Sequence, residues 1–152
     1  MPIDYQNPWI DAAVVVATAI AVCLCVLLHY ETLSWMSRWL VRLRHQKRRR
    51  VLFCIFGVLS VHIAEIWIFG IAFAVLLLWP DMGAVQGISG NVLDQVYVSA
   101  MTFTTVGTSG VVVNGPVRFL AGTEALAGLV LITWSASFTY LEMQRFWPDR
   151  ER

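Results

Sequence analysis

The residues best suited to bind an ion lie in one short stretch between Tyr97 and Gly110. There an apolar segment is followed by six residues that could line an ion path: Thr104, Thr105, Val106, Gly107, Thr108 and Ser109. Threonine hydroxyls and backbone carbonyls are oxygen ligands, and rings of carbonyls can replace the water around a cation. A glycine in such a loop can adopt the positive φ angles that a tight backbone path requires. We therefore interpret these six residues as a candidate ion-binding loop.

The segments around this loop are apolar enough to lie in a membrane. Hydrophobic residues make up 58% of the 152 residues and charged residues only 14%, which is unlike a soluble domain. Residues 12–28, 51–79 and 117–147 are each long enough to form a helix that crosses the bilayer. The segment 92–103 is too short to cross, and Asn91 can cap it as a short helix. Irregular backbone at membrane depth must be buried in protein or line water, so we expect a re-entrant helix and loop.

The positions of lysine and arginine predict how the chain is oriented. Residues 34–50 contain seven of these cations, whereas residues 81–118 contain one. The positive-inside rule therefore places 34–50 in the cytoplasm. The N-terminus and the start of the re-entrant loop are then outside, and the C-terminus is cytoplasmic. We expect a multi-pass protein of the plasma membrane.

The basic segment 34–50 also has a helical pattern. One face of the helix would carry Trp35, Met36, Trp39, Leu40 and Leu43. Two interpretations are open: an interfacial amphipathic helix that binds anionic lipid, or a basic linker that sets topology without lipid specificity. Membrane lipid is the expected partner of such a segment, and nucleic acid is not, because membrane spans flank it.

The loop and its surroundings resemble the pore loop of the potassium channel superfamily, whose filter reads Thr-Val-Gly-Tyr-Gly. Four residues here match the start of that pattern: Thr104, Thr105, Val106 and Gly107. Tyr97, Ser99 and Thr102 match the aromatic-x-Ser-x-x-Thr pattern of its pore helices. The resemblance covers residues 51–147 and is strongest to small bacterial channels with two helices and a pore loop. It implies a location in the bacterial inner membrane.

This resemblance implies an all-α integral membrane protein with three transmembrane helices and a re-entrant pore helix and filter loop between the second and third. Its parts would be an N-terminal transmembrane helix (1–33), a cytoplasmic basic amphipathic linker (34–50) and a pore domain (51–152). One chain supplies one loop, so the pore would require a homotetramer. The implied function is a channel for monovalent cations such as potassium or sodium, with no enzymatic activity, cofactor or bound metal. The alternative is a non-conducting membrane subunit or scaffold that keeps the channel fold.

Four further positions take their expected roles from the same resemblance. Thr108 and Ser109 stand where the family has Tyr and Gly, so we expect a wider outer filter and a weaker preference for potassium over sodium. Glu124 is expected behind the filter, where it would accept hydrogen bonds that support the loop. Gly128 falls at the place of the family's inner-helix hinge glycine.

Two titratable residues fall within the second predicted span. Glu65 is near its middle, and His62 lies three residues earlier on the same helical face. Acids inside membrane spans are functional candidates by default. Three interpretations are open for the pair: a structural hydrogen bond between helices, a proton-responsive switch, or a metal site. His-x-x-Glu alone supplies too few ligands for zinc, so we expect no metal and a carboxyl that is protonated or closely paired.

Overall fold

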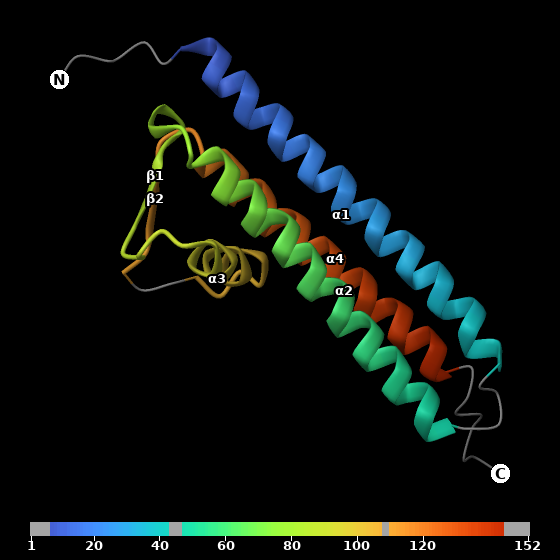
Figure 1. Cartoon of the computed structure of the whole chain (residues 1–152). Helices are drawn as coiled ribbons and strands as arrows, with labels where there is room; N and C mark the ends of the chain where they lie inside the picture. The colour runs from blue at the N-terminus through green and yellow to red at the C-terminus, as the bar shows by residue number, and fades with distance from the viewer. Residues whose placement is uncertain (1–6, 43–46, 108–109, 145–152) are drawn as a thin grey trace.

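The computed structural model describes residues 7–42, 47–107 and 110–144. It is mostly helical, and its elements in chain order are α1 (Pro8–Arg42), α2 (Lys47–Leu76), the 3₁₀ turn η1 (Pro80–Met82), β1 (Ala84–Gln86), α3 (Val92–Phe103), β2 (Val112–Asn114) and α4 (Arg118–Gln144). Figure 1 shows α1, α2 and α4 side by side as three long rods, with the short α3 to one side of them, near the two strands.

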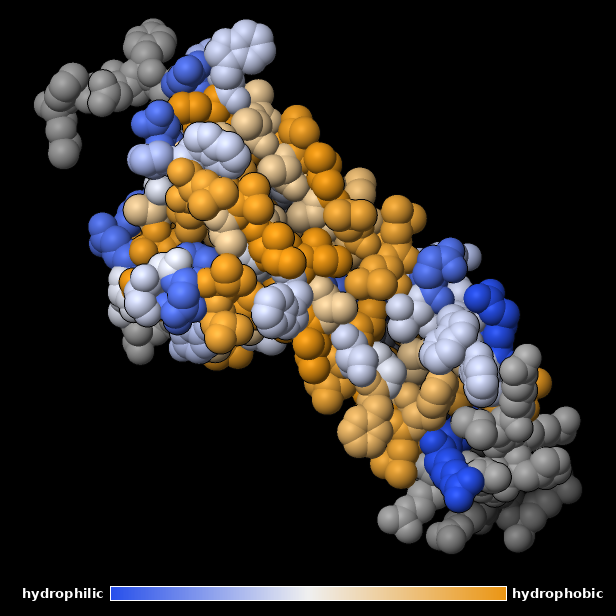
Figure 2. Space-filling view, viewed as in Figure 1, coloured by the Kyte–Doolittle hydropathy of each residue, from blue (hydrophilic) through white to orange (hydrophobic). Residues whose placement is uncertain are grey.

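Three of these helices, α1, α2 and α4, are long and apolar enough to cross a membrane. Figure 2 shows hydrophobic residues over the middle of the bundle and hydrophilic residues gathered toward its two ends. These features are those of a multi-pass membrane protein, and the prediction of three helices long and apolar enough to span a membrane is confirmed. The short helix between the second and third spans is also present, and it begins and ends at the predicted residues.

The first helix is longer than the sequence analysis predicted. Instead of ending at a boundary after residue 33, α1 continues without a break through Arg42. The reason is packing: Met36 and Leu40 are fully buried in a small apolar cluster that also contains Cys54 of α2 and Phe138 of α4. Met36 and Leu40 of the apolar face predicted for the linker therefore cover protein, whereas Trp35 and Trp39 of the same face stay exposed. Leu43 lies outside the described residues.

The long helices pack through a stripe of small and apolar side chains on α1. Five buried residues recur there at intervals of three or four: Val14, Thr18, Ala21, Cys25 and His29. That interval keeps them on one helical face, and small residues allow neighbouring helices to approach closely. The larger core side chains come from the other helices: Phe69, Phe73, Phe103, Leu120 and Leu131.

A short β-hairpin joins the beginning and the end of the segment between α2 and α4. The all-α prediction did not include it. β1 and β2 pair antiparallel, with Val85 opposite Val113 at the centre of the register. Beside them, the backbone N–H of Val117 donates to the carbonyl of Met82 at 3.0 Å. The segment that carries α3 therefore leaves and rejoins the bundle at a single point.

The opposite end of the bundle is joined by an ion pair. Arg50 near the start of α2 lies 3.3 Å from the Glu142 carboxylate near the end of α4, from Nη2 to Oε2. Both side chains are buried. The two helices that flank the segment containing α3 are thus fixed to each other at both ends.

Candidate functional site

The short helix α3 is held at its N-terminus by local hydrogen bonds. The Asn91 side chain accepts from the backbone N–H of Asp94 at 2.9 Å, as predicted for an N-cap. The Asp94 carboxylate in turn accepts from the N–H and the hydroxyl of Ser89, at 2.9 and 2.6 Å. An acid in the first turn also suits the positive end of the helix dipole. These contacts fix where α3 begins.

At the other end, α3 stops at Phe103 and the backbone enters the predicted loop. The N–H of Thr104 bonds to the carbonyl of Ala100 at 3.1 Å, and the N–H of Gly107 reaches back to Met101 at 3.2 Å. Gly107 has a φ of 74°, which confirms the predicted positive value. Thr108 and Ser109 lie outside the described residues.

Thr105 adopts a conformation that the sequence did not predict. Its φ is 57°, in the left-handed region that β-branched residues avoid. This conformation costs about 1–2 kcal/mol for a non-glycine residue. Backbone strain of this kind concentrates at functional sites, where the surroundings hold it in place. The threonine therefore marks the turn as a constrained segment.

The described part of the loop lies on the surface of the single chain. Residues 104–107 are all exposed, and Val106 keeps 71% of its surface accessible.

Glu124 lies against α3, where Ser99 is its partner. Both side chains are fully buried. The Ser99 hydroxyl lies within hydrogen-bond distance of Glu124 Oε1 and, at 2.8 Å, of the Ile66 carbonyl oxygen. A hydroxyl has one proton to donate, so both contacts are hydrogen bonds only if Glu124 is protonated and donates to Ser99. The other carboxyl oxygen, Oε2, is buried without a partner among the described residues, which also favours the neutral form.

The sequence prediction for Glu124 is thus refined. The acid does sit beside α3, but the contact that the structure describes is to Ser99, and the predicted support of the filter itself is not tested. The two residues were singled out separately in the sequence, and nothing in the sequence paired them.

Gly128 lies where α4 crosses the end of α3. A Cβ at this position would overlap the backbone carbonyl of Phe103. The helix passes through Gly128 without interruption, so close packing is a sufficient reason for a glycine here. The predicted hinge role stays a prediction.

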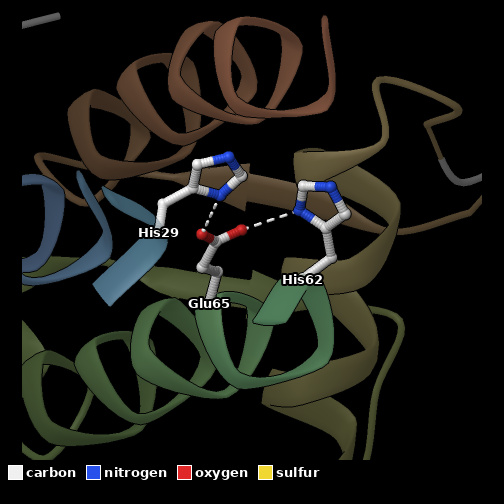
Figure 3. A group of neighbouring side chains, drawn as sticks. All are labelled: His29, His62 and Glu65. Carbon is white, nitrogen blue, oxygen red and sulfur yellow. Dashed lines mark hydrogen bonds and ion pairs between the residues drawn. The ribbon is translucent and has the colours of Figure 1, made fainter. Parts of the chain in front are cut away.

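A second cluster forms around Glu65, and it contains a residue that the sequence analysis missed. His29 Nδ1 lies 2.8 Å from Glu65 Oε1, and His62 Nδ1 lies 2.8 Å from Glu65 Oε2. Figure 3 shows the two imidazole rings on either side of the carboxylate, one from α1 and one from α2. His29 and Glu65 are fully buried, whereas the His62 side chain is 15% exposed. The predicted pairing of Glu65 with His62 is confirmed.

The cluster is enclosed by side chains of α4 and α3. Ser135 Oγ lies 3.3 Å from His29 Nε2, and the ring of Trp134 is 5.1 Å from the His29 ring. His62 packs its ring against Phe103, at 5.8 Å. Because Phe103 is the last residue of α3, the cluster lies directly beneath the start of the candidate loop.

One signal in the sequence could have identified His29. It falls on the same helical face as Thr18, Ala21 and Cys25, so its imidazole belongs to the stripe that packs against other helices.

The site has two connected parts, which are the loop with α3 and the histidine–glutamate cluster that contacts the end of α3 through Phe103. No protein-family model, curated protein or solved structure matches this chain, so its function must be argued from this geometry.

Proposed function

We propose that the chain is one subunit of a homotetrameric channel for monovalent cations, with residues 104–109 as its ion filter. The observation that carries the proposal is the re-entrant segment. A capped helix of 12 residues ends in an exposed, glycine-containing turn and is held between two helices that can span a membrane. We place the channel in the bacterial inner membrane, with the N-terminus outside and the C-terminus in the cytoplasm.

The length of α3 supports this arrangement. Twelve residues extend about 18 Å, roughly half the thickness of the hydrocarbon core of a bilayer. Figure 1 shows α3 running across the direction of α2 and α4, so its length carries the turn after Phe103 inward from one surface by less than about 18 Å. Backbone without regular hydrogen bonds is tolerated there where it is buried in protein or lines water. A water-filled axis shared by several subunits meets that condition.

The electrostatics at the end of α3 also suit a cation. A helix carries a partial negative charge at its C-terminus, from carbonyls without helical partners. Four copies of the loop around one axis would present rings of carbonyl and hydroxyl oxygens, the chemistry by which a filter replaces ion hydration. The exposed Val106 would then be covered by neighbouring subunits.

One observation favours the alternative of a non-conducting subunit or scaffold. The N–H of Gly107 turns back to the Met101 carbonyl at 3.2 Å, so the start of the loop forms a hydrogen-bonded turn that closes α3. In that case the fold serves assembly, and the same tetramer forms without ion flux. The two functions therefore share a quaternary structure and differ in transport.

Ion flux from the purified full-length chain in liposomes tests the proposal. We expect flux of potassium and sodium, with potassium favoured only modestly, because Thr108 and Ser109 replace the tyrosine and glycine of a potassium-selective filter. The double substitution Thr108→Tyr with Ser109→Gly should increase the preference for potassium. Native mass spectrometry of the same preparation should show four chains.

Gly107→Ala tests the filter at a single position. A Cβ there meets no atom within 4 Å among the described residues of one chain, so within the chain the substitution acts through the positive φ, at a cost of about 1–2 kcal/mol. Flux should fall while the tetramer persists. A wild-type tetramer without flux of either ion would favour the scaffold, and a monomer would contradict both functions.

A further inference from the structure

The arrangement of His29, His62 and Glu65 extends beyond ion conduction. One ligand-type atom of each residue, a ring nitrogen of each histidine and a carboxylate oxygen of Glu65, lies within 4.8 Å of the other two. They come from two helices, and each imidazole points its Nδ1 at a separate oxygen of the same carboxylate (Figure 3). We propose that these residues bind a divalent transition-metal ion of the zinc class.

The donor set matches the chemistry of that class. Two imidazoles and one carboxylate form the protein ligands of a known type of zinc site, in which a fourth position stays open for water or another small ligand. Ligand atoms in a tetrahedral zinc site lie about 3.3 Å apart, from zinc–ligand distances of about 2.0–2.1 Å. The ligand-type atoms of the cluster lie at most 4.8 Å apart, so binding the ion would move them by up to about 1.5 Å relative to one another. Soft anionic ligands are not required, because imidazole nitrogen suits zinc, nickel and copper alike.

The structure also places a hydrogen-bond partner beside the second ring nitrogen of His29. Histidines that bind metals usually donate their second ring N–H to a neighbouring acceptor, which fixes the tautomer and the ring orientation. Ser135 Oγ lies 3.3 Å from His29 Nε2. With an ion on Nδ1, the Nε2–H donates to this hydroxyl. Without the ion, Nδ1–H donates to Glu65 and Nε2 accepts from the hydroxyl of Ser135, so the cluster is satisfied in both states.

The helices that carry the cluster determine how a bound ion would act on the fold. His29 belongs to α1 and Glu65 to α2, while Ser135 adds α4. An ion bound here would hold α1 against the helices that carry the re-entrant segment. His62, as the partly exposed member, provides the side on which an ion could approach. This role does not depend on whether the loop conducts.

Metal binding can be measured on the full-length chain, purified through a tag without histidine and treated with a chelator. After dialysis against Zn²⁺, elemental analysis should find one ion per chain, and Co²⁺ should give the visible absorption of a tetrahedral nitrogen–oxygen site. Zn²⁺ should also raise the temperature of unfolding. His62→Gln and Glu65→Gln keep side-chain volume and hydrogen bonding but should abolish all three signals. Ser135→Ala should weaken binding about 10-fold.

Two control substitutions separate this site from other metal ligands of the chain. Cys25→Ser removes a buried thiol that contacts the Glu65 backbone carbonyl at 3.8 Å. His45→Ala removes the one histidine of the sequence that is not in the cluster, and His45 lies outside the described residues. Both variants should bind as the wild type does. Equal binding by wild type and His62→Gln, or loss of binding in His45→Ala alone, would overturn the proposal. Because His62 is partly exposed, its substitution tests the site even if changes at His29 prevent folding.

Discussion

Two buried acids, Glu65 and Glu124, meet the same physical problem in different ways. An ionised carboxylate away from water must be paired with opposite charge or strong donors. Glu65 has an imidazole nitrogen at 2.8 Å from each of its oxygens, so both of its oxygens have a partner. Glu124 meets only the Ser99 hydroxyl among the described residues. The count of protons therefore assigns a neutral carboxylic acid to Glu124.

Substitution of Glu124 tests that assignment. Glutamine has the same shape and can donate an amide N–H to Ser99, so Glu124→Gln should change the unfolding free energy by less than about 1 kcal/mol. Glu124→Ala leaves a cavity and should cost roughly 3 kcal/mol. Thermal unfolding in detergent, followed by circular dichroism, measures both. Ser60→Ala, an exposed site on α2 whose hydroxyl bonds to its own helix, is the control. Equal losses in the Gln and Ala variants would contradict the assignment of a neutral carboxylic acid.

At the scale of elements, the position of α3 is decided by how closely the long helices approach it. The helix packs against both α2 and α4, and its C-terminal turn fits against the backbone of α4 at Gly128. Its N-terminus is set by the Asn91 and Asp94 caps. Local capping consequently anchors the N-terminus of α3, and tertiary contact anchors its C-terminus, where the loop begins.

Gly128 and Gly122 form a matched pair on α4 for testing this contact. A methyl group at Gly128 would overlap the Phe103 carbonyl, whereas one at Gly122 meets nothing within 4 Å. Gly128→Ala should therefore destabilise the protein by about 1–3 kcal/mol. Gly122→Ala should stabilise it by up to about 1 kcal/mol, from helix propensity. Unfolding temperatures of the two variants give the comparison, and a gain at both positions would rule out close packing as the reason for Gly128.

At the scale of the whole molecule, the two ends of the bundle differ in character. α1 ends and α2 begins at the end where α4 also finishes, and the β1–β2 hairpin lies at the opposite end (Figure 1). The Arg50–Glu142 pair is at the first of these ends. The cluster of basic residues in the sequence adjoins this pair. One end of the bundle is therefore basic, and the other carries the hairpin.

Reporter fusions test which side faces the cytoplasm. A reporter placed near Gln46 or after Arg152 should be cytoplasmic, because the basic residues are retained on that side. A reporter near Gly87 should be external. Replacing the arginines of residues 48–50 by glutamine should weaken this orientation. A cytoplasmic signal from the Gly87 fusion would contradict the proposed direction of the re-entrant loop.

The sequence by itself determined the features that depend on neighbouring residues. Runs of apolar side chains set the three spans, the Asn91 cap set the start of α3, and the need for a positive φ was readable at Gly107. These follow from local composition and backbone sterics, which act over a few residues. The bounds of α3 and the contact between His62 and Glu65, three positions apart, were predictable for that reason.

Only the tertiary structure decided which helical faces meet. His29 reaches Glu65 across 36 positions and Ser135 across 106, and no local pattern encodes those distances. The continuation of α1 to Arg42 likewise depends on apolar partners from α2 and α4 that bury Met36 and Leu40. Helix packing depends on the matching of whole surfaces. A single helical face of the sequence can show which residues will be buried, while the other helices decide what they contact.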